Sequence, residues 1–395
     1  MTSPGLLQRV ERLAERFAGR AVEYDRAASF PTDDIEDLRS EGLLGLMAPA
    51  RLGGMGCGFL DYVRVGAVLA QGSGSTALIF NMHAAVTGAL AGVPDELARA
   101  LGAGEEFFAV RDRVLSAAAS GALYGVAISE REAGSRLSRM GATYELEDGG
   151  YRLRGEKSVC SGAGHLDAYL VAARAADQAQ ESKVSYFLVP AGDGLEVGAT
   201  WDPLGMRATA SNPVVLDVVV PADCLLTGVE GLAVPLAYAM PQWLVASYAA
   251  VYVGLAEAAV SEAVGHLNRQ RPVRRPGPPA WVRGRLGRAQ AATDAARLVL
   301  EHAARLVDTS PGDPEANRWV YQAKLVAGDT AMEVAAVLAE ACGLSALGRG
   351  SALERIFRDA RCGAIMPPRS DVCADYLGTT ALGGDPMADM EDPPW

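Results

Sequence analysis

The chain has 395 residues, half of them hydrophobic and 21% charged, with a formal net charge of −12. At about 100–200 residues per domain, this length predicts two or three domains that share a large core. The composition excludes a disordered chain, a collagen-like repeat and a small disulfide-stapled module. The acidic balance argues against nucleic acid as a partner, because a protein that binds a phosphate backbone needs the opposite charge.

Cysteine spacing and apolar stretches indicate the compartment. The six cysteines are scattered without a CxxC pair, so neither a zinc site nor a disulfide framework is expected. Residues 1–19 carry charges at short intervals and lack the apolar core of a signal peptide. Residues 231–256 carry no charge, but Pro235 and Pro241 interrupt them, which favours a buried helix over a membrane span. We therefore expect a reduced, cytoplasmic protein with no membrane partner.

The first third of the chain has helical periodicity. Apolar residues recur at helical spacing from Leu6 to Val22, which predicts an amphipathic helix. Thr32 or Asp33 is expected to cap a second, short helix that ends at Gly42. Alanine- and leucine-rich stretches continue to about residue 119, so we expect an N-terminal helical domain over residues 1–122.

The middle of the chain is rich in strand signals. Alternating runs at residues 143–146 and 151–154 flank Asp-Gly-Gly, which predicts a hairpin. Further short apolar runs follow at residues 168–173, 184–189 and 214–220. They predict a β-barrel or sandwich over residues 123–226. Helical patterns resume near Leu232, so residues 227–395 are expected to form a C-terminal helical bundle, and the fold class is α+β.

Three motifs occur in order along the chain. The first is VAISEREAGS at residues 126–135, followed by RGEKSVCSGA at residues 154–163. The second is PLGMRATASN at residues 203–212, and the third runs from CG at residues 342–343 to IFRDAR at residues 356–361. Together, and at this spacing, they resemble the acyl-CoA dehydrogenase family of flavoproteins over essentially the whole chain.

The resemblance implies a fold and a cofactor. Members have an N-terminal helical domain, a β-barrel and a C-terminal four-helix bundle, and assemble as homodimers or homotetramers. FAD lies between barrel and bundle and reaches a neighbouring subunit. The positions that match the family's cofactor contacts are Ile128, Ser129, Gly134, Ser135, Cys160, Ser161, Arg271 and Gly343.

Serines replace two flavin-contacting threonines of the family. Ser129 stands where a threonine bonds the edge of the flavin ring, and Ser161 stands where a threonine lies beside N5. Both keep a hydroxyl group, although small hydroxyl residues are also common in ordinary turns. The resemblance places Arg207 and Ser211 at positions that contact the flavin or the substrate edge of the site, and Arg369 could face a carboxylated or phosphorylated group of the substrate.

The catalytic base of the family is missing. Family members remove the α-proton of an acyl thioester with a glutamate while a hydride passes from the β-carbon to the flavin. Counted from the RDA motif, the glutamate position is Pro367; the alternative position used by a minority of members is Leu244. Asp371 and Asp375 are the nearest carboxylates that could substitute, and Ser370 or Asp371 could equally cap the helix that follows.

Two further departures concern the cofactor. Val159 stands where a tryptophan usually shields the flavin, so that face is expected to be more open. Residues 269–276 contain four arginines, Arg271 among them. They could hold the FAD pyrophosphate or a thioester carrier's phosphate, or form a solvated loop.

Three functions are compatible with these features. The first is an FAD-dependent oxidoreductase that acts on an acyl thioester of coenzyme A or acyl carrier protein and passes electrons to a flavoprotein or oxygen. The second is a flavin monooxygenase, which needs no α-proton base. The third is a catalytically silent flavin-binding homologue. We expect the first, and the alanine- and arginine-rich composition is typical of GC-rich bacteria, where specialised metabolism is a plausible setting.

Overall fold

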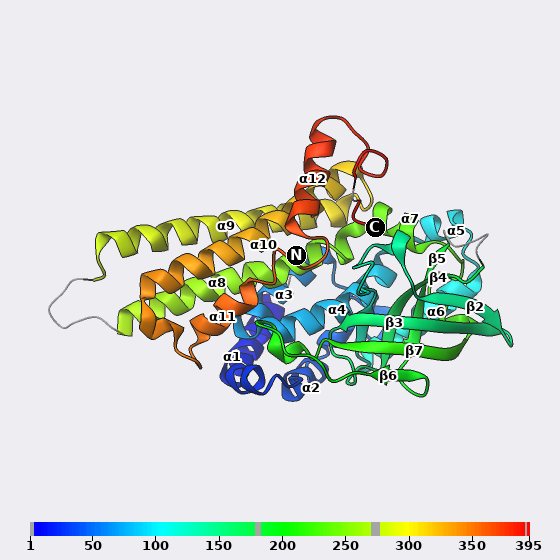
Figure 1. Ribbon diagram of the computed structural model, residues 1–395, viewed down its shortest axis with the longest axis horizontal. Helices are drawn as coiled ribbons and strands as arrows, with labels where there is room; N and C mark the ends of the chain where they lie inside the picture. The colour runs from blue at the N-terminus through cyan, green and yellow to red at the C-terminus, as the bar shows by residue number, and fades with distance from the viewer. Residues whose placement is uncertain (1–3, 178–182, 270–276, 392) are drawn as a thin grey trace.

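The structure is a computed structural model that describes residues 4–177, 183–269, 277–391 and 393–395. Helices form the first and last thirds of the chain, and strands form the middle third (Figure 1). The curled sheet lies at one end of the molecule, and the long helices of the last third extend away from it. The expected α+β fold is confirmed. The domain boundaries at residues 122 and 226 stay predictions.

The first third contains the expected helices. They are α1 (Pro4–Ala27), α2 (Thr32–Ser40), α3 (Phe59–Gly72), α4 (Gly74–Gly92), α5 (Asp95–Ala100) and α6 (Glu105–Ala119). α1 buries one apolar stripe, as its periodicity predicts. α4 is buried on nearly every side because it packs against α3, α6, α8 and β1.

Helix α2 begins differently from the prediction. Pro31 occupies the cap position, and no side chain caps the helix, so neither Thr32 nor Asp33 acts as the cap. Both lie in the first turn, because Pro31 leads directly into it. Gly42 lies just beyond the helix with a φ of 70°, a conformation that glycine adopts without steric cost.

The strands of the described residues form one mixed, seven-stranded sheet. They are β1 (Tyr124–Ala127), β2 (Thr143–Glu147), β3 (Gly150–Cys160), β4 (Ala168–Ala175), β5 (Val184–Pro190), β6 (Leu195–Val197) and β7 (Asn212–Pro221). Their order is β1-β4-β2-β3-β7-β6, and β5 also pairs with β4. The β2–β3 hairpin is confirmed; Asp148 and Gly149 both have positive φ, as a tight hairpin turn requires.

The described residues of the last third form six α-helices. They are α7 (Ala233–Ala239), α8 (Ala246–Arg269), α9 (Ala280–Thr309), α10 (Pro314–Cys342), α11 (Ala352–Ala360) and α12 (Ser370–Ala381). In Figure 1, α8, α9, α10 and α11 lie side by side, and the contacts between these helices agree. This is the four-helix bundle that the family resemblance implies.

The uncharged segment forms the centre of this bundle. The helical stretch Pro241–Arg269 is long and apolar enough to cross a membrane, but 83% of its most apolar window is buried inside the protein. α8 packs against α3, α4, α9, α10 and α11. Burial within the fold accounts for its composition, as expected.

Candidate active site

A cleft of about 490 Å³ lies where the sheet, α4 and the last third of the chain meet. The end of β1 and the following turn contribute Ile128, Ser129, Glu130, Gly134 and Ser135. β3 and the residue after it contribute Ser158, Val159 and Ser161. The last third of the chain contributes Leu244, Tyr248, Arg361, Cys362, Ile365, Met366 and Pro367. This volume lies within the range of pockets that hold cofactors and other small molecules.

Backbone pairing positions Ser129 at the cleft wall. The amide of Ser158 donates to the carbonyl of Ser129 at 2.8 Å, and the Ser158 hydroxyl donates to the same oxygen at 3.2 Å. Because these bonds tie the turn after β1 to β3, the side chains of Ser129, Ser158 and Ser161 reach one cavity.

A buried ion pair fixes this turn further. The Nζ of Lys157 donates to Oε1 of Glu130 at 2.6 Å and to the carbonyl of Ala172 at 2.6 Å. Glu130 also accepts the amides of Gly141 and Ala142. Burial opposes the charge on Glu130, but Lys157 and the two amides outweigh it and hold its pKa below the ordinary value. Glu130 therefore stays ionised and serves a structural role.

A chain of three buried hydroxyls leads into the protein from the cleft. Thr209 donates to the carbonyl of Met206 at 2.9 Å, and the Oγ atoms of Ser211 and Thr209 are 2.7 Å apart. Ser161 and Ser211 are 2.9 Å apart. Each hydroxyl has one proton, so in this arrangement Ser211 donates to Thr209 and Ser161 donates to Ser211. Ser161 thus presents acceptor lone pairs toward the cleft. We call these three residues the hydroxyl relay.

Arg207 lies outside the cleft lining. Its Nη1 donates to Asp202 at 2.7 Å and to the carbonyl of Pro203 at 2.9 Å, and its Nε donates to the carbonyl of Asp25 at 3.0 Å. These bonds fasten the loop at residues 201–206 to α1. Ser211, the other residue assigned to the substrate edge, lies behind Ser161 in the hydroxyl relay.

The RDA motif binds the loop that forms part of the cleft wall. Arg358 pairs with Glu354 and Asp25 and donates to the carbonyl of Leu204. Asp359 accepts the amide of Met206 at 2.6 Å, and its burial raises its pKa to about 6. Through these bonds the motif attaches α11 to the loop that lines the cleft.

The described residues that line the cleft offer no carboxylate base. Glu130 is the sole acid among them, and it is held by Lys157. Pro367 and Leu244, the two positions at which the resemblance implies a glutamate, both line the cleft. Burial raises the pKa of Cys362 to about 12 and also raises that of Tyr248. None of these groups accepts a proton readily at neutral pH.

The two candidate aspartates lie outside the cleft lining. Asp371 is exposed and pairs with Arg369 at 2.7 Å; this pairing lowers its pKa. Asp375 is exposed on α12. Neither Ser370 nor Asp371 caps α12 in the expected way: the helix begins at Ser370, whose hydroxyl donates to Asp329 at 2.7 Å.

A second, smaller cleft of about 240 Å³ adjoins the first. The two share Gly134, Ser135, Ile365 and Pro367. The side chains of Arg136 and Arg369 line the smaller cleft, so its charge would suit a phosphate group attached to a ring in the larger one.

The remaining predicted cofactor residues lie elsewhere. Cys160 is fully buried behind the cleft wall. Gly343 ends α10 with a φ of 78° and is absent from the cleft lining. Arg271 lies outside the described residues. Of the predicted cofactor contacts, the cleft therefore unites Ile128, Ser129, Gly134, Ser135 and Ser161.

Sequence reasoning missed two tryptophans at the cleft. Trp201 lines it and donates its indole N–H to the carbonyl of Arg207 at 3.1 Å. Trp395 also lines it, is buried, and donates to the Tyr321 hydroxyl at 3.1 Å. No motif marks either residue, and the return of Trp395 to the cleft depends on tertiary packing.

The fold is helical–β–helical, and hydroxyls line one part of its cleft while apolar side chains line the rest. Sequence profiles of the acyl-CoA dehydrogenase N-terminal, middle and C-terminal domains match residues 5–121, 125–219 and 245–377. The chain belongs to the acyl-CoA dehydrogenase family, and it is a flavoenzyme of the oxidoreductase class.

Its relatives catalyse more than one reaction. A Bacillus subtilis protein named as an acyl-CoA dehydrogenase, YdbM, is 31% identical over 95% of this chain and 96% of its own. The L-evernosamine nitrososynthase of a Micromonospora species is 32% identical over 94% of this chain and 88% of its own. The structure of KijD3 with FMN and a dTDP-amino-keto sugar superposes with a TM-score of 0.85, at 27% identity over 98% and 95% of the two chains.

Proposed function

We propose that the protein is an FAD-dependent oxidoreductase that acts on an acyl thioester, carried on coenzyme A or acyl carrier protein, by α,β-dehydrogenation or a variant of it. The observation that carries the proposal is that Ser129, Ser135 and Ser161 line one cleft together with apolar residues of α4, of α8 and of the turn before α8. Met82, Leu244 and Tyr248 supply that apolar part, which suits an acyl chain.

The residues present fit a flavin. A bound flavin accepts the hydride that the substrate loses. The hydroxyl relay gives Ser161 an acceptor toward the cleft; if all three hydroxyls turn together, Ser161 donates instead. The carbonyl of Met206 tolerates this turn because it also accepts the Thr209 amide at 3.2 Å. The relay can therefore match a ring nitrogen in either protonation state.

FAD is proposed as the cofactor because the family resemblance implies it; the adjoining cleft would suit the phosphate that either FAD or FMN carries. Ser135 and Gly134 border both cavities, and Arg136 and Arg369 line the smaller one. These residues would receive the phosphate end of the cofactor. In our proposal Gly343 and Arg271 serve the cofactor of a neighbouring subunit in a homodimer or homotetramer, and the enzyme is cytoplasmic.

The absence of a carboxylate base limits the rate. The substrate's α-proton would leave to water or to a group outside the described lining, because Pro367 cannot accept it. A positioned general base typically contributes about 10²–10⁴ in rate. We therefore expect thioester oxidation that is slower by a factor of this order than in a member with the glutamate.

A second candidate is a flavin monooxygenase. The specific observation that favours it is again Pro367, since oxygenation with reduced flavin requires no α-proton base. The nitrososynthase relative and the FMN-bound KijD3 structure lend it support.

Two assays test the proposal. In the first, the cofactor is released by heat and identified by mass spectrometry. FAD is expected, and FMN would contradict the proposed identity of the cofactor. In the second, the flavin-loaded protein is first given an acyl thioester together with an acceptor, either an electron-transfer flavoprotein or oxygen. A separate flavin reductase is then added. The proposal expects turnover with thioester and acceptor alone. Product formation only with the reductase and oxygen would establish the monooxygenase.

A further inference from the structure

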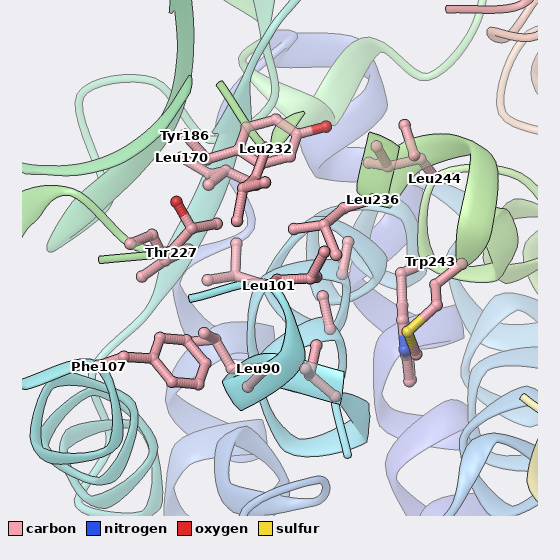
Figure 2. Close-up of a pocket in the computed structure, with 18 of the residues that line it drawn as sticks. Leu90, Leu101, Phe107, Leu170, Tyr186, Thr227, Leu232, Leu236, Trp243 and Leu244 are labelled. Carbon is pink, nitrogen blue, oxygen red and sulfur yellow. The ribbon is translucent and has the colours of Figure 1, made fainter. Parts of the chain in front are cut away.

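Trp243 separates two cavities. One is the apolar cavity beneath α7 that Figure 2 shows. The other is a groove of about 320 Å³ between the start of α3, the end of α4, the 3₁₀ turn Pro241–Trp243 and the end of α9. Among the described residues Trp243 alone lines both of them, and none lines both this groove and the flavin cleft. We call it the Trp243 groove.

A buried carboxamide in the wall of this groove has no partner. Gln242 is 2% exposed, and its side chain lines the groove. Neither its oxygen nor its NH₂ group has a hydrogen-bond partner within the part of the chain that the structure describes. A carboxamide offers two donors and an acceptor oxygen, and leaving them unpaired in a buried position is destabilising. Gln242 therefore marks a place where hydrogen bonds from a ligand would be stabilising.

The indole N–H of Trp243 is a second group of this kind. The residue is buried, and its N–H has no acceptor among the residues that the structure describes. A Cβ atom placed on Gly92 would lie 3.7 Å from this Nε1, and Gly92 lines the groove but not the cavity beneath α7. The nitrogen edge of the indole therefore lies on the groove side, next to Gln242 in the chain.

The charge of the groove selects against anions. Asp308 is the one charged side chain of the described lining, and it accepts the amides of Phe59 at 2.7 Å and Leu60 at 3.0 Å. Burial raises the pKa of Cys57 to about 11, so this thiol of the lining stays neutral at pH 7. A carboxylate without a nearby cation repels a negative ligand, which leaves neutral molecules as the suitable class.

We propose that the Trp243 groove binds a small neutral molecule that carries a carboxamide. The carbonyl oxygen of the ligand accepts hydrogen bonds from Gln242 and Trp243, and its N–H donates to the Gln242 oxygen. Met47, Phe59 and Val307 offer apolar contact to a ring attached to the amide. The volume is within the range of small-molecule pockets. The inference does not rest on the proposed function, because the groove and the flavin cleft share no described residue.

A matched pair of probes tests the proposal. Benzamide and benzoate have nearly the same shape, but benzoate is negative and has no N–H to donate. Calorimetry with the flavin-loaded protein measures the affinity of each probe without turnover. Benzamide is expected to bind, and benzoate is expected to bind at least about tenfold more weakly, because it loses a hydrogen bond and is repelled by Asp308.

Gln242→Met tests the carboxamide directly. Methionine has nearly the size of glutamine but neither its donors nor its strong acceptor. We expect the variant to bind benzamide about tenfold more weakly, because two hydrogen bonds are lost. The substitution removes an unpaired buried amide, so the free energy of unfolding, measured in urea, should not fall.

Two variants of α4 locate the probe without changing Gln242. Gly92→Leu places a side chain over the indole nitrogen and is expected to weaken benzamide binding by about tenfold or more. Ala89→Val is the control, because Ala89 lines the cavity beneath α7 but not the groove. Its affinity for benzamide should equal that of the wild type. Unfolding curves establish that both variants are folded.

Several results would overturn the proposal. Absence of benzamide binding to the wild type would mean that the groove holds water only. Equal affinities for the two probes, an unchanged affinity in Gln242→Met, or a loss in Ala89→Val but not in Gly92→Leu would each contradict the assignment. None of these readouts depends on flavin reduction. If thioesters fail to reduce the flavin while benzamide binds as described, the proposed function fails and the groove assignment stands.

Discussion

Pro367 stands where the family resemblance implies a catalytic glutamate. It lines the cleft where a glutamate is expected. Among the described residues of the lining, the only carboxylate belongs to Glu130, which is paired with Lys157. Counting residues from the RDA motif identified this position from the sequence alone. The sequence could not establish that Asp371 and Asp375 lie outside the lining, because that depends on how α12 is placed after residue 369.

Restoring the base should raise the rate of flavin reduction. We expect Pro367→Glu to accelerate anaerobic reduction by an acyl thioester about 10²–10⁴-fold, since the new carboxylate lies in the cleft and can take the α-proton. Stopped-flow absorbance of the flavin measures the rate. Pro367→Gln has the same size without a base and should remain slow. Equal rates in the two variants would count against a thioester in this cleft.

Asp359 should make stability depend on pH. Burial raises its pKa from 3.8 to about 6. Between these values the folded chain keeps the proton that the unfolded chain releases, so the free energy of unfolding falls as pH rises. Asp359→Asn lacks this contribution. The free energy of unfolding of the variant minus that of the wild type should therefore rise by at most about 1.4 kcal/mol per pH unit from pH 4 to pH 6.

Urea unfolding at several pH values provides the measurement. Taking the difference between variant and wild type cancels the other titrating groups, as long as their surroundings are unchanged. The asparagine of the variant keeps a side-chain oxygen that can accept the Met206 amide. A difference that stays constant with pH would show that Asp359 is ionised throughout.

Among the structural elements, the turn after β1 is held to β3 at the cleft by a buried charged pair. Lys157 is fully buried and donates both to Glu130 and to the carbonyl of Ala172 on β4. The sequence predicted the strands from their alternation. It did not reveal this pair, because the two residues come together only when the turn after β1 pairs with β3.

Breaking the Lys157–Glu130 ion pair should destabilise the folded protein. Lys157→Met leaves Glu130 without its counter-charge, and we expect the free energy of unfolding to fall by about 3–5 kcal/mol. The double variant Lys157→Met, Glu130→Gln removes both charges and should recover part of that loss. Chemical denaturation of both variants measures the effect. If the double variant is no more stable than the single one, the uncompensated charge is not the cause.

At the scale of the whole molecule, the end of the described chain returns to the flavin cleft. Trp395 is buried there against Tyr321 of α10, although residues 382–391 are mostly exposed. The helical, β and helical thirds were predictable from periodicity and from motif order. This long-range closure was not, because no local signal specifies which cavity a distant tryptophan fills.

Removing this tryptophan should open the cleft. Trp395→Ala is expected to make the bound flavin more accessible to iodide and to lower the free energy of unfolding by about 3–5 kcal/mol, as for other buried aromatic side chains. Quenching of flavin fluorescence measures the first effect. Trp281→Ala is the control, because Trp281 is exposed on α9 and absent from the cleft lining. Equal quenching in both variants would mean that Trp395 does not cover the flavin.

The most direct test of the central claim is an anaerobic titration of the flavin-loaded protein with acyl-CoA and acyl-carrier-protein thioesters, followed by absorbance. We predict slow but complete bleaching of the flavin band by at least one thioester. A flavin that stays oxidised with every thioester, and that forms product only after reduction by a separate reductase and admission of oxygen, would contradict the account.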